Sequence, residues 1–329
     1  MNPTKTNLCL ILTLILTFAF LKGTAQLSQD SIKHFRSFGN PIITDKYTAD
    51  PAAMVDGETL WLFTGHDFQG GQKSYKMKDW CVFSSKDLKN WTEYPTPLKI
   101  SDFKWDKSGA AYAAQTIKRN GKYYWYISTN GSGIGVAVAD NPQGPYKDAI
   151  GKPLLTNDDC FASKHYWTCI DPTVIIDKDD QAWIIWGNGV CYFAKLKPNM
   201  IEIDGSVGKI DFENFKFTEA PWIHYRKGKY YLSYATGFPE KIAYAIADKV
   251  DGPYTYKGIL NELAGNSNTN HQSIVEFKGK WYFIYHNGAI NRDGGSFSRS
   301  VCIDQLEYGP NGILKKVQMS SDGVKGLVK

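Results

Sequence analysis

After its first 25 residues the sequence contains no apolar run long enough to span a membrane. The one long apolar stretch, "LCLILTLILTFAFL" at 8–21, has 14 residues, which is short for a transmembrane helix. It lies between Lys5 and the small residues of "GTA", as in a secretory signal peptide cleaved before Gln26. No cysteine follows this point directly, which disfavours a lipid anchor. We therefore predict a signal peptide over residues 1–25, one domain over 26–329, and a secreted or periplasmic protein without membrane association after cleavage.

Runs of basic residues are also absent, and the net charge is small. The whole chain carries +5, and setting aside residues 1–25, whose only charged residues are Lys5 and Lys22, leaves +3. Proteins that bind nucleic acid concentrate Lys and Arg on one surface, because each phosphate contact needs a positive charge. The sequence therefore gives no reason to expect a nucleic-acid partner.

The cysteines show no metal-binding pattern. No Cys-x-x-Cys pair occurs, which disfavours zinc. Five cysteines remain beyond residue 25, so at least one thiol is unpaired unless it joins another chain: Cys81, Cys160, Cys169, Cys191 and Cys302. We expect them to be mostly buried and structural. Cys160 and Cys169 are close enough in sequence to bridge, and the sequence leaves that open.

Helical periodicity is nearly absent beyond residue 25, while aromatic residues are abundant at 14% of the chain. Aromatic side chains pack well on the pleated surface of a sheet, so this composition favours strands. Their flat rings also suit stacking on the apolar faces of sugars, although packing in a core explains most of them.

A pattern of two strands around a tight turn recurs five times. It appears as "ADPAAMVDGETLWLFTG", "AAQTIKRNGKYYWYIS", "IDPTVIIDKDDQAWIIWGN", "EAPWIHYRKGKYYLSYA" and "HQSIVEFKGKWYFIYHNG", beginning at positions 49, 113, 170, 219 and 271. The turns carry Gly, Asn or Asp, which tolerate the positive φ of tight hairpins. Further short strands between the hairpins give each repeat roughly four strands, which is the content of a propeller blade. We therefore predict an all-β, five-bladed β-propeller, with an irregular sandwich as the competing fold.

The propeller geometry predicts where distant acids meet. The first hairpin strand of each repeat would be innermost, so the residues that open these strands face one another around the axis. Asp50, Asp171 and Glu219 hold this place in the first, third and fourth repeats. Each acid alone is more simply a turn or surface residue. Three acids at corresponding places of three repeats are harder to attribute to chance.

Three acids around one cavity suit hydrolysis of a glycosidic bond without a covalent intermediate. One carboxylate deprotonates a water, and a second, protonated carboxyl group donates to the leaving oxygen, about 6.5–9.5 Å away. A third acid can raise the pKa of the donor by like-charge repulsion. The longer side chain of Glu219 suits the donor, and the shorter Asp50 suits the base.

Four motifs carry a definite resemblance: "NPIITDKYTADPAAM", "IDPTVIIDKDDQAWIIWG", "TEAPWIHYRKGKYYLSYA" and "GGSFSRSVCIDQLEYGPNGILKKVQM". Over roughly residues 38–320 the chain resembles glycoside hydrolase family 43, the five-bladed propeller glycosidases that invert the anomeric centre. The resemblance implies Asp50 as general base, Glu219 as general acid and Asp171 as modulator of the pKa of the acid. One departure is Ala114, which stands where many members have a proline.

The branch that the chain most resembles contains arabinoxylan arabinofuranosidases and xylosidases. We expect removal of terminal α-L-arabinofuranosyl groups from arabinoxylan or arabinan-type plant polysaccharide, with β-D-xylosidase activity on xylo-oligosaccharides as the alternative. Endo-arabinanase activity and a non-catalytic glycan-binding propeller are the remaining alternatives, since a fold does not fix a function.

Several further residues are candidate substrate contacts. Trp167 lies four residues before Asp171 and is a candidate stacking wall, and Asn287 in "YHNG" is placed to reach the pocket. Phe238 and Arg299 resemble a family aromatic residue of the sugar pocket and a family arginine that binds the sugar. Each also has a simpler interpretation, as core, loop, turn or surface residue.

His271 opens the fifth inner strand and resembles a family histidine beside a calcium ion or water cluster in the channel. Calcium prefers oxygen ligands, so one histidine says little about the ion. We expect no required cofactor, with structural calcium as an open alternative. His66 and Asp67, in "TGHD", are expected on a rim loop, without enough ligands for zinc.

Overall fold

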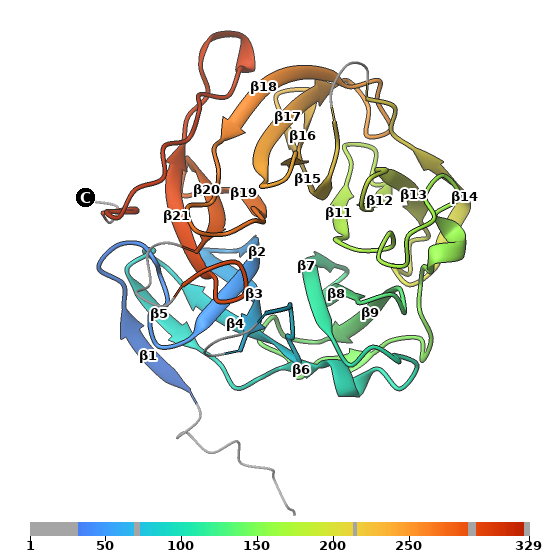
Figure 1. Cartoon of the computed structure of the whole chain (residues 1–329), viewed down its shortest axis with the longest axis horizontal. Helices are drawn as coiled ribbons and strands as arrows, with labels where there is room; N and C mark the ends of the chain where they lie inside the picture. The colour runs from blue at the N-terminus through green and yellow to red at the C-terminus, as the bar shows by residue number, and fades with distance from the viewer. Residues whose placement is uncertain (1–31, 69–72, 213–215, 289–293, 326–329) are drawn as a thin grey trace, which may run out of the picture. The chain divides into compact units, whose positions relative to one another are not determined.

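The structure is a computed structural model that describes residues 32–68, 73–212, 216–288 and 294–325. The signal peptide predicted over residues 1–25 lies outside the described residues. Residues Ile32–Lys329 form one compact unit, and within it five antiparallel sheets surround a central axis (Figure 1). The five-bladed β-propeller predicted from the repeats is confirmed.

Three blades have the four strands that the repeats predict. The second blade contains β7 (Ala111–Arg119), β8 (Lys122–Thr129), β9 (Ile134–Ala139) and β10 (Lys147–Asp148). The third contains β11 (Thr173–Ile176), β12 (Ala182–Trp186), β13 (Tyr192–Leu196) and β14 (Ile203–Lys209). The fourth contains β15 (Glu219–Arg226), β16 (Lys229–Thr236), β17 (Lys241–Ala247) and β18 (Thr255–Asn261).

The first and last blades differ from this plan. The first has six strands, β2 (Tyr47–Asp56), β3 (Thr59–Asp67), β4 (Asp79–Ser85), β5 (Asn90–Glu93), β1 (Lys33–Arg36) and β6 (Leu98–Lys99). The fifth has three, β19 (Gln272–Phe277), β20 (Lys280–Asn287) and β21 (Ser300–Leu306). The helices of the described residues are short 3₁₀ turns, η2 (Ile100–Asp102), η3 (Asn157–Asp159) and η4 (Pro310–Gly312).

The ring closes where the chain entering the first blade runs beside the last. The backbone N–H of Ile42 donates to the carbonyl of Val301 at 2.8 Å, and that of Thr48 donates to the carbonyl of Arg299 at 2.9 Å. These bonds satisfy backbone groups at the outer edge of β21, which would otherwise be an open sheet edge. The closure also brings Arg299 next to the start of β2.

The innermost strands are β2, β7, β11, β15 and β19 (Figure 1). Tight turns join three of them to their partners, at Asn120–Gly121, Lys227–Gly228 and Lys278–Gly279, and both residues of each turn have positive φ. This is the geometry that matches the twist of the flanking strands. Aromatic side chains then fill the space between blades; for example, Phe63 and Trp125 meet edge to face with centroids 4.9 Å apart.

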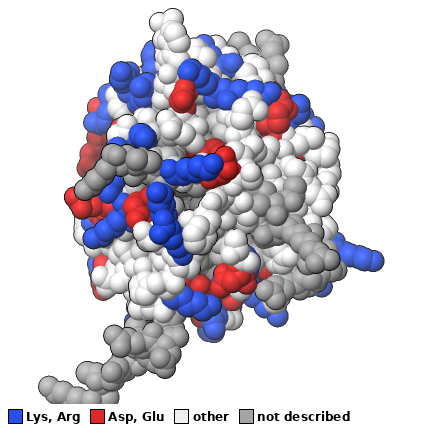
Figure 2. Space-filling view, turned by 90° about the vertical axis from the view of Figure 1, so that its left-hand side faces the viewer, with Lys and Arg blue, Asp and Glu red and all other residues white. Residues whose placement is uncertain are grey.

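The five cysteines beyond residue 25 are buried free thiols, as the sequence predicts, and Cys160 hydrogen-bonds Cys169. In the part of the chain that the structure describes, no helix is long and apolar enough to cross a bilayer. Basic and acidic side chains are intermixed on the face shown in Figure 2, and exposed ion pairs such as Lys118 with Asp56 are common. The surface in this view therefore does not have the concentrated positive charge of a nucleic-acid interface.

Candidate active site

An unusual backbone conformation presents the acids at the start of the inner strands. Asp50 and Asp171 are left-handed, with φ of 47° and 58°, and a proline follows each. In the fourth blade the left-handed residue is Ala220, with φ of 55°. Asp is among the few residues that tolerate this region, whereas Ala there is strained. Glu219, the predicted acid, therefore lies one residue before the place that Asp50 and Asp171 hold in their blades, because the left-handed residue of this blade is the one after it.

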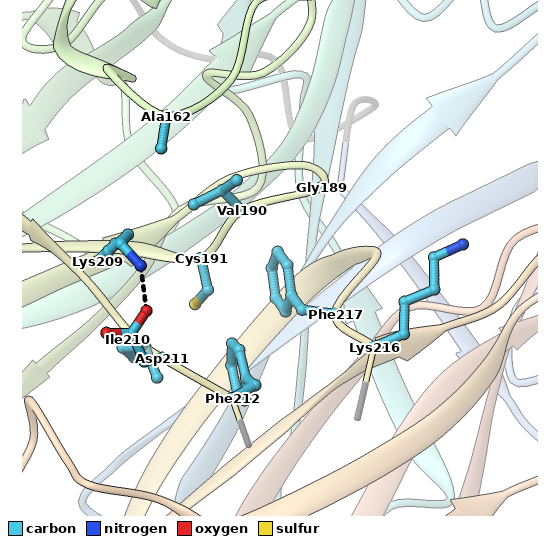
Figure 3. Close-up of a pocket in the computed structure, with 10 residues that line it drawn as sticks. All are labelled: Ala162, Gly189, Val190, Cys191, Lys209, Ile210, Asp211, Phe212, Lys216 and Phe217. Carbon is cyan, nitrogen blue, oxygen red and sulfur yellow. Dashed lines mark hydrogen bonds and ion pairs between the residues drawn. The ribbon is translucent and has the colours of Figure 1, made fainter. Parts of the chain in front are cut away.

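One hollow of about 500 Å³ brings the three acids together. Its lining includes Asp50, Asp171 and Glu219, and also four of the other predicted residues: Trp167, Phe238, His271 and Arg299. We call it the acid hollow. A different hollow of about 670 Å³, shown in Figure 3, has Asp211 as its only carboxylate among the described lining residues, and Asp211 pairs with Lys209. The acid-base chemistry is therefore concentrated in the acid hollow.

Asp50 is buried beside the guanidinium group of Arg299 and two histidine rings. Its Oδ1 accepts a hydrogen bond from Arg299 Nη1 at 2.8 Å and lies 3.3 Å from His286 Nδ1 and 3.8 Å from His271 Nδ1. Burial alone would raise the pKa of Asp50, but the Arg299 charge, with His286 and His271, outweighs burial and holds this pKa well below its usual range. Asp50 is therefore an ionised carboxylate, the form that a base requires.

Arg299 is positioned by a second buried acid that the sequence analysis misplaced. Asp67 is the last residue of β3 and is buried, so the expectation of a rim loop is wrong for it. Its two carboxylate oxygens accept hydrogen bonds from Nε and Nη2 of Arg299, each at 2.9 Å. This bidentate contact fixes the guanidinium group and leaves Nη1 for Asp50.

Glu219 lies in the opposite electrostatic environment. Burial, together with the negative charge of Asp50, raises its pKa, although hydrogen bonds from Asn188 and Glu240 act in the other direction. Asp171 Oδ2 accepts a hydrogen bond from the backbone N–H of Ala220 at 3.1 Å, directly beside Glu219. Burial, with the charges of Glu219 and Asp50, raises the pKa of Asp171 well above its usual range. This part of the hollow therefore holds protons.

A family model for glycosyl hydrolases family 43 matches residues 38–314 of this chain. The chain belongs to glycosyl hydrolases family 43. The family resemblance is therefore confirmed, and the acid hollow lies in a glycoside hydrolase of this family.

Individual family members agree with this assignment. The arabinoxylan arabinofuranohydrolase of Paenibacillus polymyxa is 30% identical over 88% of this chain, which spans 53% of that protein's length. The xylosidase/arabinosidase 43A of Humicola insolens is 31% identical, with 83% of this chain and 97% of that protein covered.

Solved structures agree as well. A β-xylosidase/α-arabinofuranosidase of the family from a compost microbial metagenome, in complex with xylotriose and described as calcium-free, has a TM-score of 0.76 at 27% identity, covering 87% of this chain and 98% of that one. An α-L-arabinofuranosidase from Clostridium thermocellum has a TM-score of 0.73 at 36% identity, with the same coverage.

Glu240 is a fourth buried acid of this family 43 site, and the sequence analysis missed it. It lies two residues after Phe238, lines the acid hollow, hydrogen-bonds Glu219, and accepts a hydrogen bond from the backbone N–H of Asn270 at 2.9 Å. Burial and the charge of Glu219 raise the pKa of Glu240 well above its usual range. The short segment "GFPE" had no repeat partner that would have marked this residue.

The sequence analysis also chose Asn287 where its neighbour has the closer position. His286 is buried in β20, where its Nδ1 accepts a hydrogen bond from the backbone N–H of Asp50 at 3.3 Å. Successive residues of a strand point to opposite faces. Asn287 is absent from the described lining of the acid hollow, and its Nδ2 lies 3.3 Å from Met319 Sδ. The structure therefore places His286, rather than Asn287, next to Asp50.

Two aromatic side chains at the acid hollow are exposed, as sugar-stacking residues would be. Phe238 is 71% exposed and Trp167 is 41% exposed, and Trp167 meets the ring of Tyr166 edge to face at 4.7 Å. Exposed rings beside a polar hollow suit the apolar face of a sugar better than they suit a core. Their placement agrees with the interpretation of both residues as substrate contacts.

His271 offers little to a calcium ion. Calcium takes about six to eight oxygen ligands. Among the described residues around His271 the adjacent carboxylate is Asp50, whose Oδ1 already accepts from Arg299. Burial lowers the pKa of His271 to about 4 against the pull of Asp50, so its imidazole is neutral. The residues present do not form an oxygen cage for calcium, and a calcium ion here would depend on water for most of its ligands.

One other group of metal-ligating side chains occurs in the described chain, at His66, Asp79 and Cys81. His66 Nδ1 and Asp79 Oδ1 are already hydrogen-bonded at 2.7 Å, and burial raises the pKa of Cys81 to about 12. A protonated thiol is a poor zinc ligand. These three residues are therefore better described as a hydrogen-bonded pair, His66 with Asp79, beside the buried thiol of Cys81 than as a metal site.

Proposed function

We propose that this chain is an inverting, exo-acting glycosidase that removes terminal α-L-arabinofuranosyl groups from arabinoxylan or arabinan-type plant polysaccharides. The observation that carries the proposal is the presence, in one hollow, of an ionised Asp50 and a Glu219 with a raised pKa. Two carboxyl groups whose surroundings drive their pKa values apart are the arrangement that acid-base hydrolysis requires. Relatives named arabinoxylan arabinofuranohydrolase support the choice of sugar.

In this mechanism Asp50 is the general base. Its carboxylate accepts a proton from a water molecule while the oxygen of that water attacks the anomeric carbon. The hydrogen bond from Arg299 limits the side-chain freedom of Asp50 and keeps it ionised between turnovers. Attack from the side opposite the leaving group inverts the anomeric centre.

Glu219 is the general acid, and it donates its proton to the glycosidic oxygen as the bond to the anomeric carbon breaks. Asp171 and Glu240 act through Glu219 as positioning residues. Asp171 binds the backbone beside it, and Glu240 hydrogen-bonds its carboxyl group. Burial and the charge of Asp50 raise the pKa of Glu219, which favours retention of its proton at neutral pH.

Trp167 and Phe238 are proposed to stack on the substrate, and the neutral His271 to hydrogen-bond a sugar hydroxyl. A β-D-xylosidase acting on xylo-oligosaccharides is the second candidate, favoured by relatives named xylosidase/arabinosidase and β-xylosidase. An endo-arabinanase is less favoured: the relative of that name matches only 65% of this chain. We propose secretion or periplasmic export, one catalytic domain over 26–329, and no required metal.

The deciding experiment is a product screen. The purified mature chain is incubated with 4-nitrophenyl α-L-arabinofuranoside, 4-nitrophenyl β-D-xyloside, arabinoxylan, arabinan and xylo-oligosaccharides, and released sugars are identified. Free arabinose with no shorter polymer supports the proposal, and free xylose supports the second candidate. Binding without turnover of any substrate would favour the non-catalytic propeller and overturn the enzyme assignment.

Glu219→Gln tests the acid assignment separately. Glutamine keeps the size of the side chain but cannot protonate the leaving oxygen. We expect turnover of arabinoxylan, which has a poor leaving group, to fall by about 10²–10⁴-fold, and turnover of the activated nitrophenyl glycoside to fall much less. An equal loss on both substrates would contradict the assignment.

A further inference from the structure

A second hollow adjoins the acid hollow and shares its rim. It has a volume of about 780 Å³, and five residues line both hollows: Tyr75, Tyr112, Asn130, Tyr166 and Phe297. We call this second hollow the annex. A ligand long enough to extend beyond the acid hollow on this side can therefore enter the annex without crossing a wall of protein.

The annex differs from the acid hollow in its ionisable residues. Lys73, Lys76 and Lys78 line it and are exposed, and its described lining contains no Asp or Glu. The acid hollow, by contrast, holds four acids. Over the described ranges, none of these three lysines has an ion pair with a carboxylate, whereas lysines elsewhere, such as Lys122 with Asp140 at 2.6 Å, do. Three uncompensated positive charges at one hollow favour an anionic ligand.

The annex also has the aromatic surface that sugar rings use. Phe68 is 40% exposed and Tyr166 is 57% exposed, while Tyr75 and Phe297 meet edge to face at 4.7 Å. Lys78 Nζ lies 5.7 Å from the centroid of the Phe68 ring, so a cation and an exposed ring stand side by side. This combination fits a sugar that carries a carboxylate: the ring stacks on the aromatic face while the carboxylate meets the ammonium group.

The position of the annex relative to Glu219 indicates which part of the substrate it contacts. Most of its lining comes from the first and second blades, and none comes from the fourth blade, which carries Glu219. The leaving oxygen must be next to Glu219, so the annex lies away from the atom that receives the proton. It therefore receives a part of the polymer that flanks the cleaved branch.

We propose that the annex binds a uronic-acid residue of the substrate glycan, so that the enzyme prefers acidic, uronate-substituted polysaccharide over the neutral polymer. This rests on the proposed glycosidase function and names the substrate class within it. The contacts are ion pairs between Lys76 or Lys78 and the uronate carboxylate, with stacking on the exposed rings. Lys73 adds positive charge at the outer edge.

The test compares one polymer in two charge states. Glucuronic-acid-substituted arabinoxylan and the same preparation with its carboxyl groups reduced to alcohols are hydrolysed side by side, and kcat/KM for arabinose release is measured at low and at 0.3 M salt. We expect the acidic polymer to be preferred at low salt, by about 2- to 5-fold for each lysine engaged. Added salt should remove the preference, because about 0.3 M salt screens exposed charges over a few ångströms.

Matched variants locate the effect. Lys76→Gln, Lys78→Gln and the double variant should lose the preference and raise KM on the acidic polymer, while kcat on the nitrophenyl arabinofuranoside stays unchanged. Lys122→Gln, which removes an exposed charge outside the described lining of both hollows, is the control and should behave like the unmodified enzyme. Because all these lysines are exposed, the substitutions should not disturb folding.

The outcomes separate the two proposals. No hydrolysis of any arabinofuranoside would overturn the proposed function, whatever the annex binds. Hydrolysis with equal kcat/KM on both polymers, or a preference that survives in the double variant, would overturn the uronate site alone. Titration with free glucuronate and, in parallel, with inorganic phosphate gives a third readout. Equal affinity for both anions would show nonspecific anion binding and would also overturn the uronate site.

Discussion

Asp50 and Glu219 carry the same functional group at the mouth of the same axis, yet their surroundings are opposite. Asp50 faces a guanidinium group and two imidazoles, and its pKa is held well below the usual range. Glu219 accepts hydrogen bonds from Asn188 and Glu240, and burial together with the charge of Asp50 raises its pKa. Burial favours the protonated form of both carboxyl groups, so burial does not separate their roles. The sign of the neighbouring charges does.

The comparison shows how a nearly symmetric ring produces two different roles. The acids come from the same ends of the inner strands in different blades, but the closure of the ring brings Arg299 next to the first blade. The fourth blade instead receives Asn188 from the third blade and Glu240 from its own loop. The base and the proton donor are therefore distinguished by the different neighbours of the two carboxyl groups, and not only by the choice of Asp or Glu.

Removing the negative charge of Asp50 should have the largest effect on turnover. Asp50→Asn leaves no base to accept the proton of water, so kcat should fall by about 10²–10⁴-fold on the nitrophenyl glycoside and on arabinoxylan alike. A small anionic nucleophile such as azide needs no deprotonation and should restore part of the turnover. Asp140→Asn, at an exposed acid, is the control. A loss confined to poor leaving groups would reverse the roles of Asp50 and Glu219.

Neutralising the Glu219 side should move the pH profile. Glu219 and Glu240 are hydrogen-bonded and titrate as a pair, and repulsion between two carboxylates makes the last proton leave at higher pH than it would from Glu219 alone. Glu240→Gln keeps the hydrogen bond but cannot ionise. The alkaline limb of kcat/KM should therefore move down by about one pH unit, which is about a tenfold loss on that limb.

The control for this change is Glu262→Gln, at a partly exposed glutamate paired with Lys241 at 2.7 Å and with Lys316. The acid limb should be unaffected in both variants, because Asp50 and Arg299 lie on the other side of the acid hollow. An alkaline limb that superimposes on that of the unmodified enzyme would reduce Glu240 to a purely structural residue.

The repeats in the sequence predicted the propeller and its three central acids, whereas the residues that surround these acids outside the repeats were missed. Five hairpins with their turn residues were enough to predict the propeller and to bring Asp50, Asp171 and Glu219 together. Glu240, Asn188 and Asp67 lie outside the repeated triplets, so nothing in the periodicity marked them. The sequence also pointed to Asn287 and not to His286. Adjacent residues of a strand face opposite sides, and a sequence motif does not show which of the two faces the axis, because that depends on the register of the strand.

Replacing the third acid should increase stability while it harms the site. The folded-state pKa of Asp171 is raised, so its proton is held more tightly in the folded than in the unfolded chain. Its contribution to stability is therefore present below the unfolded pKa and is lost as the pH rises through the folded pKa. Asp171→Asn keeps an acceptor for the N–H of Ala220 and removes this titration.

We expect the free energy of unfolding of Asp171→Asn to exceed that of the unmodified chain by about 1 kcal/mol or more at pH 8, since each pKa unit corresponds to about 1.4 kcal/mol. At pH 4 the two proteins should differ little. Urea denaturation at both pH values measures this, with Asp140→Asn as the control at an exposed acid. A variant that is more destabilised at pH 8 than at pH 4 would show instead that the Asp171 carboxylate stabilises the fold in its charged form.

The smallest expected effect is that of metal removal. The Asp50 side of the acid hollow already has a cation, Arg299, bonded to the carboxylate that a calcium ion beside His271 would need. Dialysis against a chelator should therefore leave kcat and Tm unchanged, because an ion at free concentration c stabilises the native state by RT ln(1 + c/Kd), which is negligible for a site with a high Kd. A loss of activity that calcium alone restores would contradict this, and would mean that water, rather than side chains, builds a functional ion site beside Asp50.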